Sequence, residues 1–121
     1  MVGSLEANQS MVAAVSKPIT LEQFLALPEI DASPAWEFIC GEVSQKPMPG
    51  GKHSRLQSRL GSAINGTVAD YEALPELRCT FGGQSIVPDV VVLATADIPV
   101  DENGDFSSTG IEFAPPWMIE I

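Results

Sequence analysis

Apolar residues recur at spacings of three and four in two stretches of the chain, which predicts two helices. The first stretch, residues 20–30, begins at Thr20, a favourable N-cap residue, with Gln23 three positions on as in a capping box. The second stretch, residues 52–74, is the longest with this spacing, so we expect the main helix there. Residues 1–17 are small and polar without a period, and we expect a flexible lead-in.

Runs of β-branched and aromatic residues lie between these helices and after them, which predicts strands. Residues 36–39 and 42–46 flank the dipeptide Cys40-Gly41 and have the pattern of a hairpin. Further runs follow the long helix, at residues 78–81, 85–94 and 116–121. The order of helix, two strands, helix and three strands predicts an α/β fold with a mixed sheet.

Two of these strands carry a carboxylate where an apolar residue is usual. Pro88 lacks an N–H group, so it should mark a bend that re-aims the next side chain, Asp89. Glu120 stands between Ile119 and Ile121, and pleating places it on the face opposite to both. If the two strands are neighbours, the carboxylates of Asp89 and Glu120 converge and need a cation, for which Mg²⁺ or Mn²⁺ is suitable. The alternative is two solvated acids at strand ends.

The formal net charge of −10 argues against nucleic acid as a partner, because phosphates require cations. The distribution of charge changes this conclusion, since residues 46–59 hold four of the six basic residues and no acid. This stretch is either a patch that contacts phosphates or an ordinary solvated helix face. Its members are Lys46, Lys52, Arg55 and Arg59.

Four segments in this order resemble the Uma2 family, also called DUF820: "WEFICGEV", "GGKHSRLQSRL", "SIVPDVVVL" and "PPWMIEI". Members of this family are abundant in cyanobacteria and are similar to restriction endonucleases of the PD-(D/E)xK superfamily. The resemblance covers about residues 20–121. It implies a restriction endonuclease-like core and a metal-dependent nuclease that hydrolyses phosphodiester bonds in nucleic acid, with DNA as the first candidate.

The same resemblance assigns roles to individual residues. Pro88-Asp89 matches the "PD" element and Glu120 the (D/E) element, so these two acids would hold Mg²⁺ or Mn²⁺. Glu37 matches an acid in the hairpin strand and His53 a histidine that enters the long helix. Each has a simpler explanation, because Glu37 could face water and a single histidine at a helix start is usually exposed. The implied catalytic set is Asp89, Glu120, Glu37 and His53. The charge distribution, and not the resemblance, adds Lys52, Arg55 and Arg59 as candidates close to the phosphate backbone.

Two features depart from the family pattern. Asp89 and Glu120 are 31 residues apart, which an acidic loop at residues 94–116 explains. The catalytic lysine two positions after Glu120 is missing, and the last apolar strand would leave an open sheet edge. We therefore expect residues 18–121 to be the N-terminal part of an endonuclease domain whose core is incomplete at the C-terminus. Without the lysine the chain could be inactive, and the alternative function is a non-catalytic relic or an acidic protein-interaction domain on the same scaffold.

Cysteine content and hydropathy predict the compartment. Cys40 and Cys79 do not form a metal-type or redox-type pair, and no charged and apolar leader precedes residue 20. The longest apolar runs, such as Val90 to Leu93, are much shorter than a bilayer requires. We expect a cytoplasmic protein without a membrane span, in which a homodimer is possible.

Overall fold

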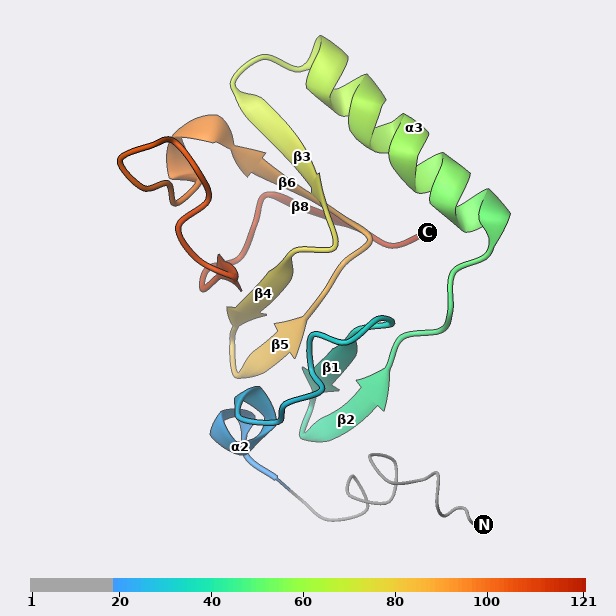
Figure 1. Ribbon diagram of the computed structural model, residues 1–121, viewed down its shortest axis with the longest axis vertical. Coiled ribbons are helices and arrows are strands. Elements are labelled where there is room, and N and C mark those ends of the chain that lie inside the picture. Colours follow the sequence, from blue (N-terminus) through green and yellow to red (C-terminus); the bar gives the residue numbers. More distant parts are fainter. Residues whose placement is uncertain (1–18) are drawn as a thin grey trace. The chain divides into compact units, whose positions relative to one another are not determined.

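The computed structural model describes residues 19–121, so the predicted lead-in at residues 1–17 lies outside the described residues. The chain divides into two compact units (Figure 1). The first takes the described part of Met1–Met48 together with Gly82–Ile86, and the second takes Pro49–Phe81 and Val87–Ile121. Among the described residues, no helix has both the length and the apolar character needed to cross a membrane.

The first unit begins with the short helix α2 (Leu21–Leu25), which has the capping box that the sequence predicts. The Gln23 N–H donates to Thr20 Oγ1 at 3.0 Å, and the Thr20 N–H donates to Gln23 Oε1 at 2.9 Å. These two bonds satisfy backbone donors that the first turn of a helix leaves without partners. Phe24 of α2 is fully buried, with its ring centroid 5.5 Å from that of Phe38.

The predicted hairpin is confirmed as β1 (Trp36–Ile39) paired antiparallel with β2 (Glu42–Gln45). Both turn residues have positive φ, 53° at Cys40 and 79° at Gly41, which is the geometry of a tight primed turn. A third strand, β5 (Gln84–Ile86), pairs antiparallel with β1 on its other side. The core of this unit is a single apolar cluster of Phe24, Ile30, Trp36, Phe38 and Val43.

The second unit is built on a three-stranded antiparallel sheet, in the order β3 (Tyr71–Pro75), β6 (Val90–Ala94) and β8 (Trp117–Ile119). One face is covered by the helix α3 (Gly51–Thr67), which runs alongside β3 in Figure 1. Ile64 of α3 packs in one cluster with residues of the sheet, and Leu60 joins it. The clustered sheet residues are Ala73, Val90, Val92 and Ile119.

An amide side chain ties α3 to β3. Asn65 Oδ1 accepts a hydrogen bond from the Ala73 N–H at 2.7 Å, and Asn65 Nδ2 donates to the Ala73 carbonyl at 3.2 Å. One side chain thus pairs with both backbone groups of a strand residue, much as a neighbouring strand would. Asn65 therefore fixes how far along β3 the helix lies.

The prediction of one helix over residues 52–74 is wrong at its C-terminal end. The helix ends at Thr67, and Asp70 adopts a φ of 67°, which turns the chain into β3. Val68 and Tyr71 continue the helical spacing by coincidence. Pairing of β3 with the buried strand β6 overrides the local preference, because it supplies a full ladder from Tyr71↔Ala94 to Pro75↔Val90.

The later strands differ from the sequence expectation in three ways. Residues 85–94 form two strands, β5 and β6, and the break falls at Pro88-Asp89, where we expect a bend. The last strand ends at Ile119, so Glu120 follows it directly. The predicted acidic loop contains a short strand, β7 (Gly110–Ile111), which pairs in parallel with β4 (Arg78–Phe81). The same loop contains the 3₁₀ turn η1 (Thr95–Asp97).

Glycine makes this parallel pair possible. A Cβ atom at Gly110 would collide with the carbonyl oxygen of Arg78. With parallel and antiparallel pairs both present, the structure is a mixed α+β fold with mixed strand pairing, as the sequence predicts.

Candidate functional site

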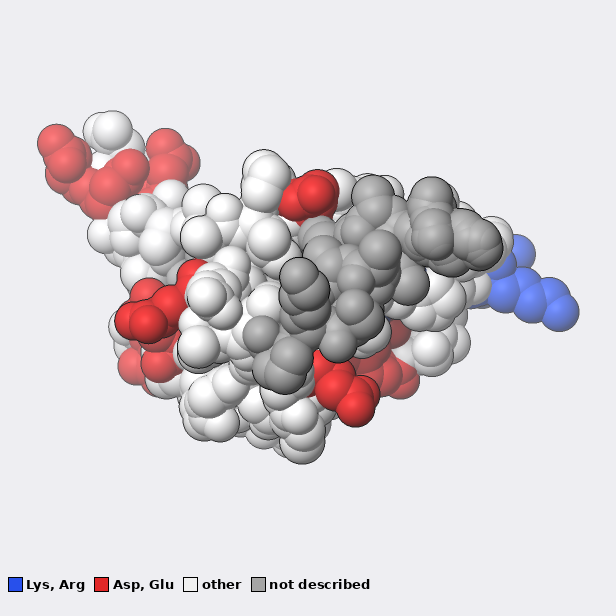
Figure 2. All heavy atoms as spheres, turned by 90° about the horizontal axis from the view of Figure 1, so that it is seen from below, with Lys and Arg blue, Asp and Glu red and all other residues white. Residues whose placement is uncertain are grey.

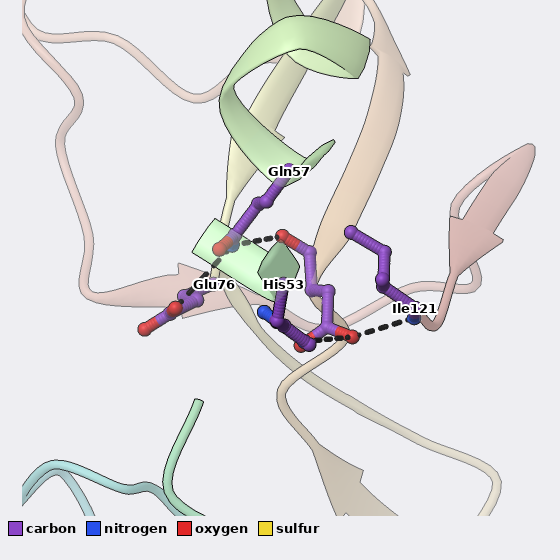
Figure 3. A network of polar contacts seen from close by, with 5 residues as sticks. His53, Gln57, Glu76 and Ile121 are labelled. Atoms are coloured by element: carbon purple, nitrogen blue, oxygen red, sulfur yellow. Dashed lines mark hydrogen bonds and ion pairs between the residues drawn. The ribbon is translucent and has the colours of Figure 1, made fainter. Parts of the chain in front are cut away.

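The bend before β6 buries a carboxylate. Pro88 is fully buried and Asp89 is only 4% exposed, and Asp89 is one of three buried polar residues in the described part of the chain. Its Oδ2 atom lies 3.1 Å from His53 Nε2 and accepts a hydrogen bond from the Ile121 N–H at 2.7 Å (Figure 3). A buried carboxylate requires such donors, because it has lost its water. The structure thus brings together two residues of the predicted set, His53 and Asp89.

His53 reaches Asp89 from the first turn of α3. The contact requires a hydrogen on Nε2, because Asp89 can offer only acceptors when it is ionised. The other ring nitrogen, Nδ1, is buried and has no hydrogen-bond partner among the described residues. The imidazole ring is therefore held by one nitrogen and enclosed at the other.

The main chain of Asp89 is held as well. Its carbonyl accepts a hydrogen bond from Gln57 Nε2 at 2.7 Å and one from the Glu76 N–H at 3.3 Å. Gln57 Nε2 also donates to Glu76 Oε2 at 3.3 Å. Gln57 lies one turn after His53, and side chains four apart share a helix face, so α3 contacts Asp89 at both its side chain and its carbonyl.

Sequence analysis did not predict Gln57 or Glu76 as part of this site. The spacing of four between His53 and Gln57 is a signal that could have identified Gln57. Glu76 gives no such signal, because its role depends on a backbone φ of 51° that is unusual for a residue other than glycine.

Glu120 follows β8, and β8 is a neighbour of β6, which was the condition for its predicted role. The register pairs Val90 with Ile119, so the chain leaves the sheet next to the Asp89 bend. Glu120 is exposed, whereas Asp89 is buried. That both acids bind one ion stays a prediction.

Glu37 lies on β1 in the first unit and is half-buried. Asp89 belongs to the second unit. A catalytic role for Glu37 stays a prediction.

The predicted phosphate contacts lie along α3. Lys52, Arg55 and Arg59 are exposed, and at 100° per residue they fall within one stripe of the helix surface. On the face seen in Figure 2, acidic side chains are visible in several separate places and basic side chains in one. These three residues form a local concentration of positive charge on an acidic protein, and we call them the α3 cations.

A groove of about 550 Å³ lies against the same helix in the second unit. Gln57 and Glu76 belong both to its lining and to the contacts around Asp89, so the groove opens beside the candidate site. Among the described residues that line the groove, Glu76 is the one with a charged side chain. The rest are small or neutral, including Ser54, Ser58, Gly61, Ser62, Asn65 and Leu74.

The donor set can be compared with what metals require. Within residues 19–121 no group of three or more His, Cys, Asp or Glu side chains is arranged to hold a metal ion. This excludes a closed zinc-type site from the described residues. Mg²⁺ usually takes only one or two carboxylates and keeps several waters, so Asp89 and Glu120 are a donor set of the right kind and number for it.

The Cys79 thiol is not among the groups that contact Asp89 in the candidate site. Burial raises the pKa of its thiol from 9.0 to about 11, and the nearby Arg78 guanidinium lowers it by less. Cys40 is exposed, and both cysteines are free thiols.

Comparison with known proteins supports the expected family. The profile of the Uma2 family, described as "putative restriction endonuclease", matches residues 21–121. A crystal structure of a "putative nuclease belonging to DUF820" from Anabaena variabilis ATCC 29413 is 48% identical, with a TM-score of 0.74. The match covers 85% of this chain and 57% of that one, so the chain spans little more than half of its relative. No curated protein matches. Because the family profile matches residues 21–121 and the fold agrees with that of the solved relative, the chain belongs to the Uma2 family.

Proposed function

We propose that the chain forms the centre of a Mg²⁺- or Mn²⁺-dependent nuclease site. This site hydrolyses phosphodiester bonds in nucleic acid, and DNA is the first candidate substrate. The observation that carries this proposal is the buried carboxylate of Asp89, fixed by His53 and by the Ile121 N–H. A buried and oriented carboxylate beside a groove is typical of a functional site. The family and the solved relative, both described as nucleases, support the same reaction class.

In this proposal Asp89 and Glu120 bind the ion through carboxylate oxygens. The ion, when bound, supplies an acidified water and compensates negative charge on the phosphate. His53 and the Ile121 N–H both contact Asp89 Oδ2, and such contacts orient a metal-binding carboxylate. Glu37 is a supporting acid in this scheme.

The α3 cations position the substrate. They begin one residue before His53 and follow the exposed face of the same helix. Because the chain carries a net charge of −10, phosphates should be held only where positive charge is concentrated. A nucleic-acid backbone on the α3 cations would approach the end of the helix that carries His53. We also propose that the protein is cytoplasmic and that it forms a homodimer.

Hydrolysis of labelled duplex DNA, single-stranded DNA and RNA, with Mg²⁺, Mn²⁺ or a chelator, tests the proposed activity. We expect cleavage that requires the metal and is lost in Asp89→Ala. Glu112→Ala is the matched control, because Glu112 is an exposed acid of the same unit and has no place in the site. Cleavage that persists in Asp89→Ala, or no cleavage of any of the three substrates, would contradict the proposal.

A second candidate is a non-catalytic relic or an acidic protein-interaction domain. It is favoured by the net charge of −10, which disfavours a phosphate-bearing partner. This candidate predicts a folded protein that binds no divalent ion and whose partner capture is insensitive to Asp89→Ala and to chelators.

A further inference from the structure

Gln57 connects three parts of the second unit through one nitrogen atom. Gln57 Nε2 donates to the Asp89 carbonyl at 2.7 Å and to Glu76 Oε2 at 3.3 Å (Figure 3). A primary amide carries two N–H groups, so these contacts use its full donor capacity. The side chain is half-buried on α3 and therefore has less freedom than an exposed glutamine.

The orientation of this amide follows from its surroundings. Both atoms that face Gln57 Nε2 are acceptors, a carbonyl and a carboxylate oxygen. With the amide reversed, Gln57 Oε1 would meet these two oxygens without any hydrogen between them. Only the observed orientation makes bonds, and a carboxylate at position 57 could not replace it.

Asp89 is consequently held at both ends. Two donors reach its carbonyl, from Gln57 and from the Glu76 N–H, and two reach Oδ2, from His53 and from the Ile121 N–H. The contacts from Gln57 and His53 come from one rigid helix, one turn apart. A residue fixed at its carbonyl and its side chain can hardly rotate as a whole, so the position of the carboxylate depends on the bond to the carbonyl.

Glu76 holds the Gln57 amide from the other side. Its φ of 51° lies in the left-handed region, which residues other than glycine seldom adopt. In this conformation Glu76 donates its N–H to the Asp89 carbonyl and offers its carboxylate to Gln57. Residues held in this region are often found at functional sites, where the surrounding contacts maintain them.

We propose that Gln57 is a positioning residue: by holding the Asp89 carbonyl from α3, it fixes the direction in which the Asp89 carboxylate points. The importance of this for metal binding rests on the proposed function. The positioning itself does not, because it concerns contacts inside the protein. The position of the carboxylate can be followed by hydrogen exchange at the Ile121 N–H, because this group donates to Asp89 Oδ2.

The test compares two amide side chains of the same helix. Gln57→Met removes the bond to the Asp89 carbonyl at nearly constant volume, and Asn65→Leu removes the bonds to Ala73 in the same way. Amide hydrogen exchange is followed by NMR at Ile121 and at Ala73 for both variants and the wild type. Since loss of one hydrogen bond of ordinary strength is felt locally, we expect about tenfold faster exchange at Ile121 in Gln57→Met, with Ala73 within about twofold of wild type. Asn65→Leu should give the reverse.

Gln57→Glu is the second variant and should accelerate exchange at Ile121 further. It places a carboxylate oxygen against the Asp89 carbonyl and Glu76 Oε2, which are both acceptors. Unchanged exchange at Ile121 in both Gln57 variants would overturn the proposal, and so would equal acceleration at Ile121 in Asn65→Leu. Titration with Mn²⁺ separates this result from the proposed function. If the wild type binds Mn²⁺, Gln57→Met should weaken binding by about tenfold, as is usual for residues that orient a ligand. If the wild type binds no Mn²⁺, the proposed function fails, while the exchange rates still decide the role of Gln57.

Discussion

His53 Nε2 lies 3.1 Å from Asp89 Oδ2, so the first turn of α3 and the bend before β6 meet at one carboxylate oxygen. The sequence separates these residues by 36 positions. Their contact defines the site, because the remaining contacts, from Gln57, Glu76 and Ile121, are all made to Asp89 or to a residue that holds it.

Replacing His53 should weaken metal binding without abolishing it. His53→Phe keeps the ring and removes the donor to Asp89 Oδ2, so the carboxylate loses one of its orienting bonds. We expect the affinity for Mn²⁺ to fall by about 10- to 100-fold, as for other residues that orient a metal ligand. Leu56→Ala is a matched control, because Leu56 is exposed on the same helix. Equal affinities of His53→Phe and wild type would show that the contact has no orienting role.

Asp89→Asn should lower stability as well as metal affinity. The amide keeps the shape of the side chain and replaces charge-assisted hydrogen bonds by neutral ones, which are weaker. We expect a loss of about 1 kcal/mol in the free energy of unfolding, measured by urea denaturation. Asp101→Asn is the comparison, because the Asp101 carboxylate accepts two hydrogen bonds, from the N–H groups of Asn103 and Asp105, but is exposed. A larger loss in Asp101→Asn would contradict the importance given to the buried carboxylate.

The α3 cations should determine the salt dependence of nucleic-acid binding. Each phosphate that a cation neutralises adds about 0.7 to 0.9 to the slope of log affinity against log salt concentration. Arg55→Gln should reduce this slope by about that amount, measured by fluorescence anisotropy with labelled DNA. Lys46→Gln removes the same charge outside the stripe and should leave the slope nearly unchanged. Identical slopes for the two variants would remove the case for a specific phosphate contact on α3.

Cys79 should make stability fall at alkaline pH. Its pKa is raised from 9.0 to about 11 by burial, so the folded state favours the neutral thiol and the unfolded chain loses the proton first. This contribution to stability is complete below pH 9.0 and is lost as the pH rises towards about 11. Urea midpoints measured between pH 8 and pH 11 should therefore fall less steeply in Cys79→Ala than in the wild type. Parallel curves for the two proteins would contradict a buried neutral thiol.

The two thiols differ in exposure, which predicts selective modification. Cys40 is exposed and Cys79 is buried, and only thiolate reacts with iodoacetamide. In the folded protein at pH 8 we expect alkylation of Cys40 alone, with both residues modified in denaturant. Peptide mass spectrometry distinguishes the two sites. Rapid labelling of Cys79 in the folded protein would mean that its surroundings open readily.

Local chemistry made several features predictable from the sequence. The capping box of Thr20 and Gln23 and the turn at Cys40-Gly41 depend on neighbouring residues, so their patterns identify them. The bend at Pro88 follows from a missing N–H group. The family resemblance pointed to His53 and Asp89 as site residues, and the structure brings these two together.

The features that sequence analysis missed depend on contacts between distant segments. β3 has helical spacing, and only its pairing with β6 makes it a strand. Apart from its spacing of four from His53, Gln57 has no feature in the sequence that distinguishes it from other helix glutamines, because its role depends on contact with the Asp89 carbonyl. Glu76 acts through a backbone conformation with positive φ, which the sequence pattern does not predict. The short β7 requires Gly110 against Arg78, a close approach that is visible only in three dimensions.

The central claim is that Asp89 binds a divalent ion, and calorimetric titration with Mn²⁺ tests it most directly. Wild type, Asp89→Ala, Glu120→Gln and the control Glu112→Ala should be titrated under the same conditions. We predict one binding event for the wild type and for Glu112→Ala, weaker binding for Glu120→Gln and none for Asp89→Ala. Binding heat of equal size in the wild type and Asp89→Ala, or no heat in the wild type, would contradict the claim.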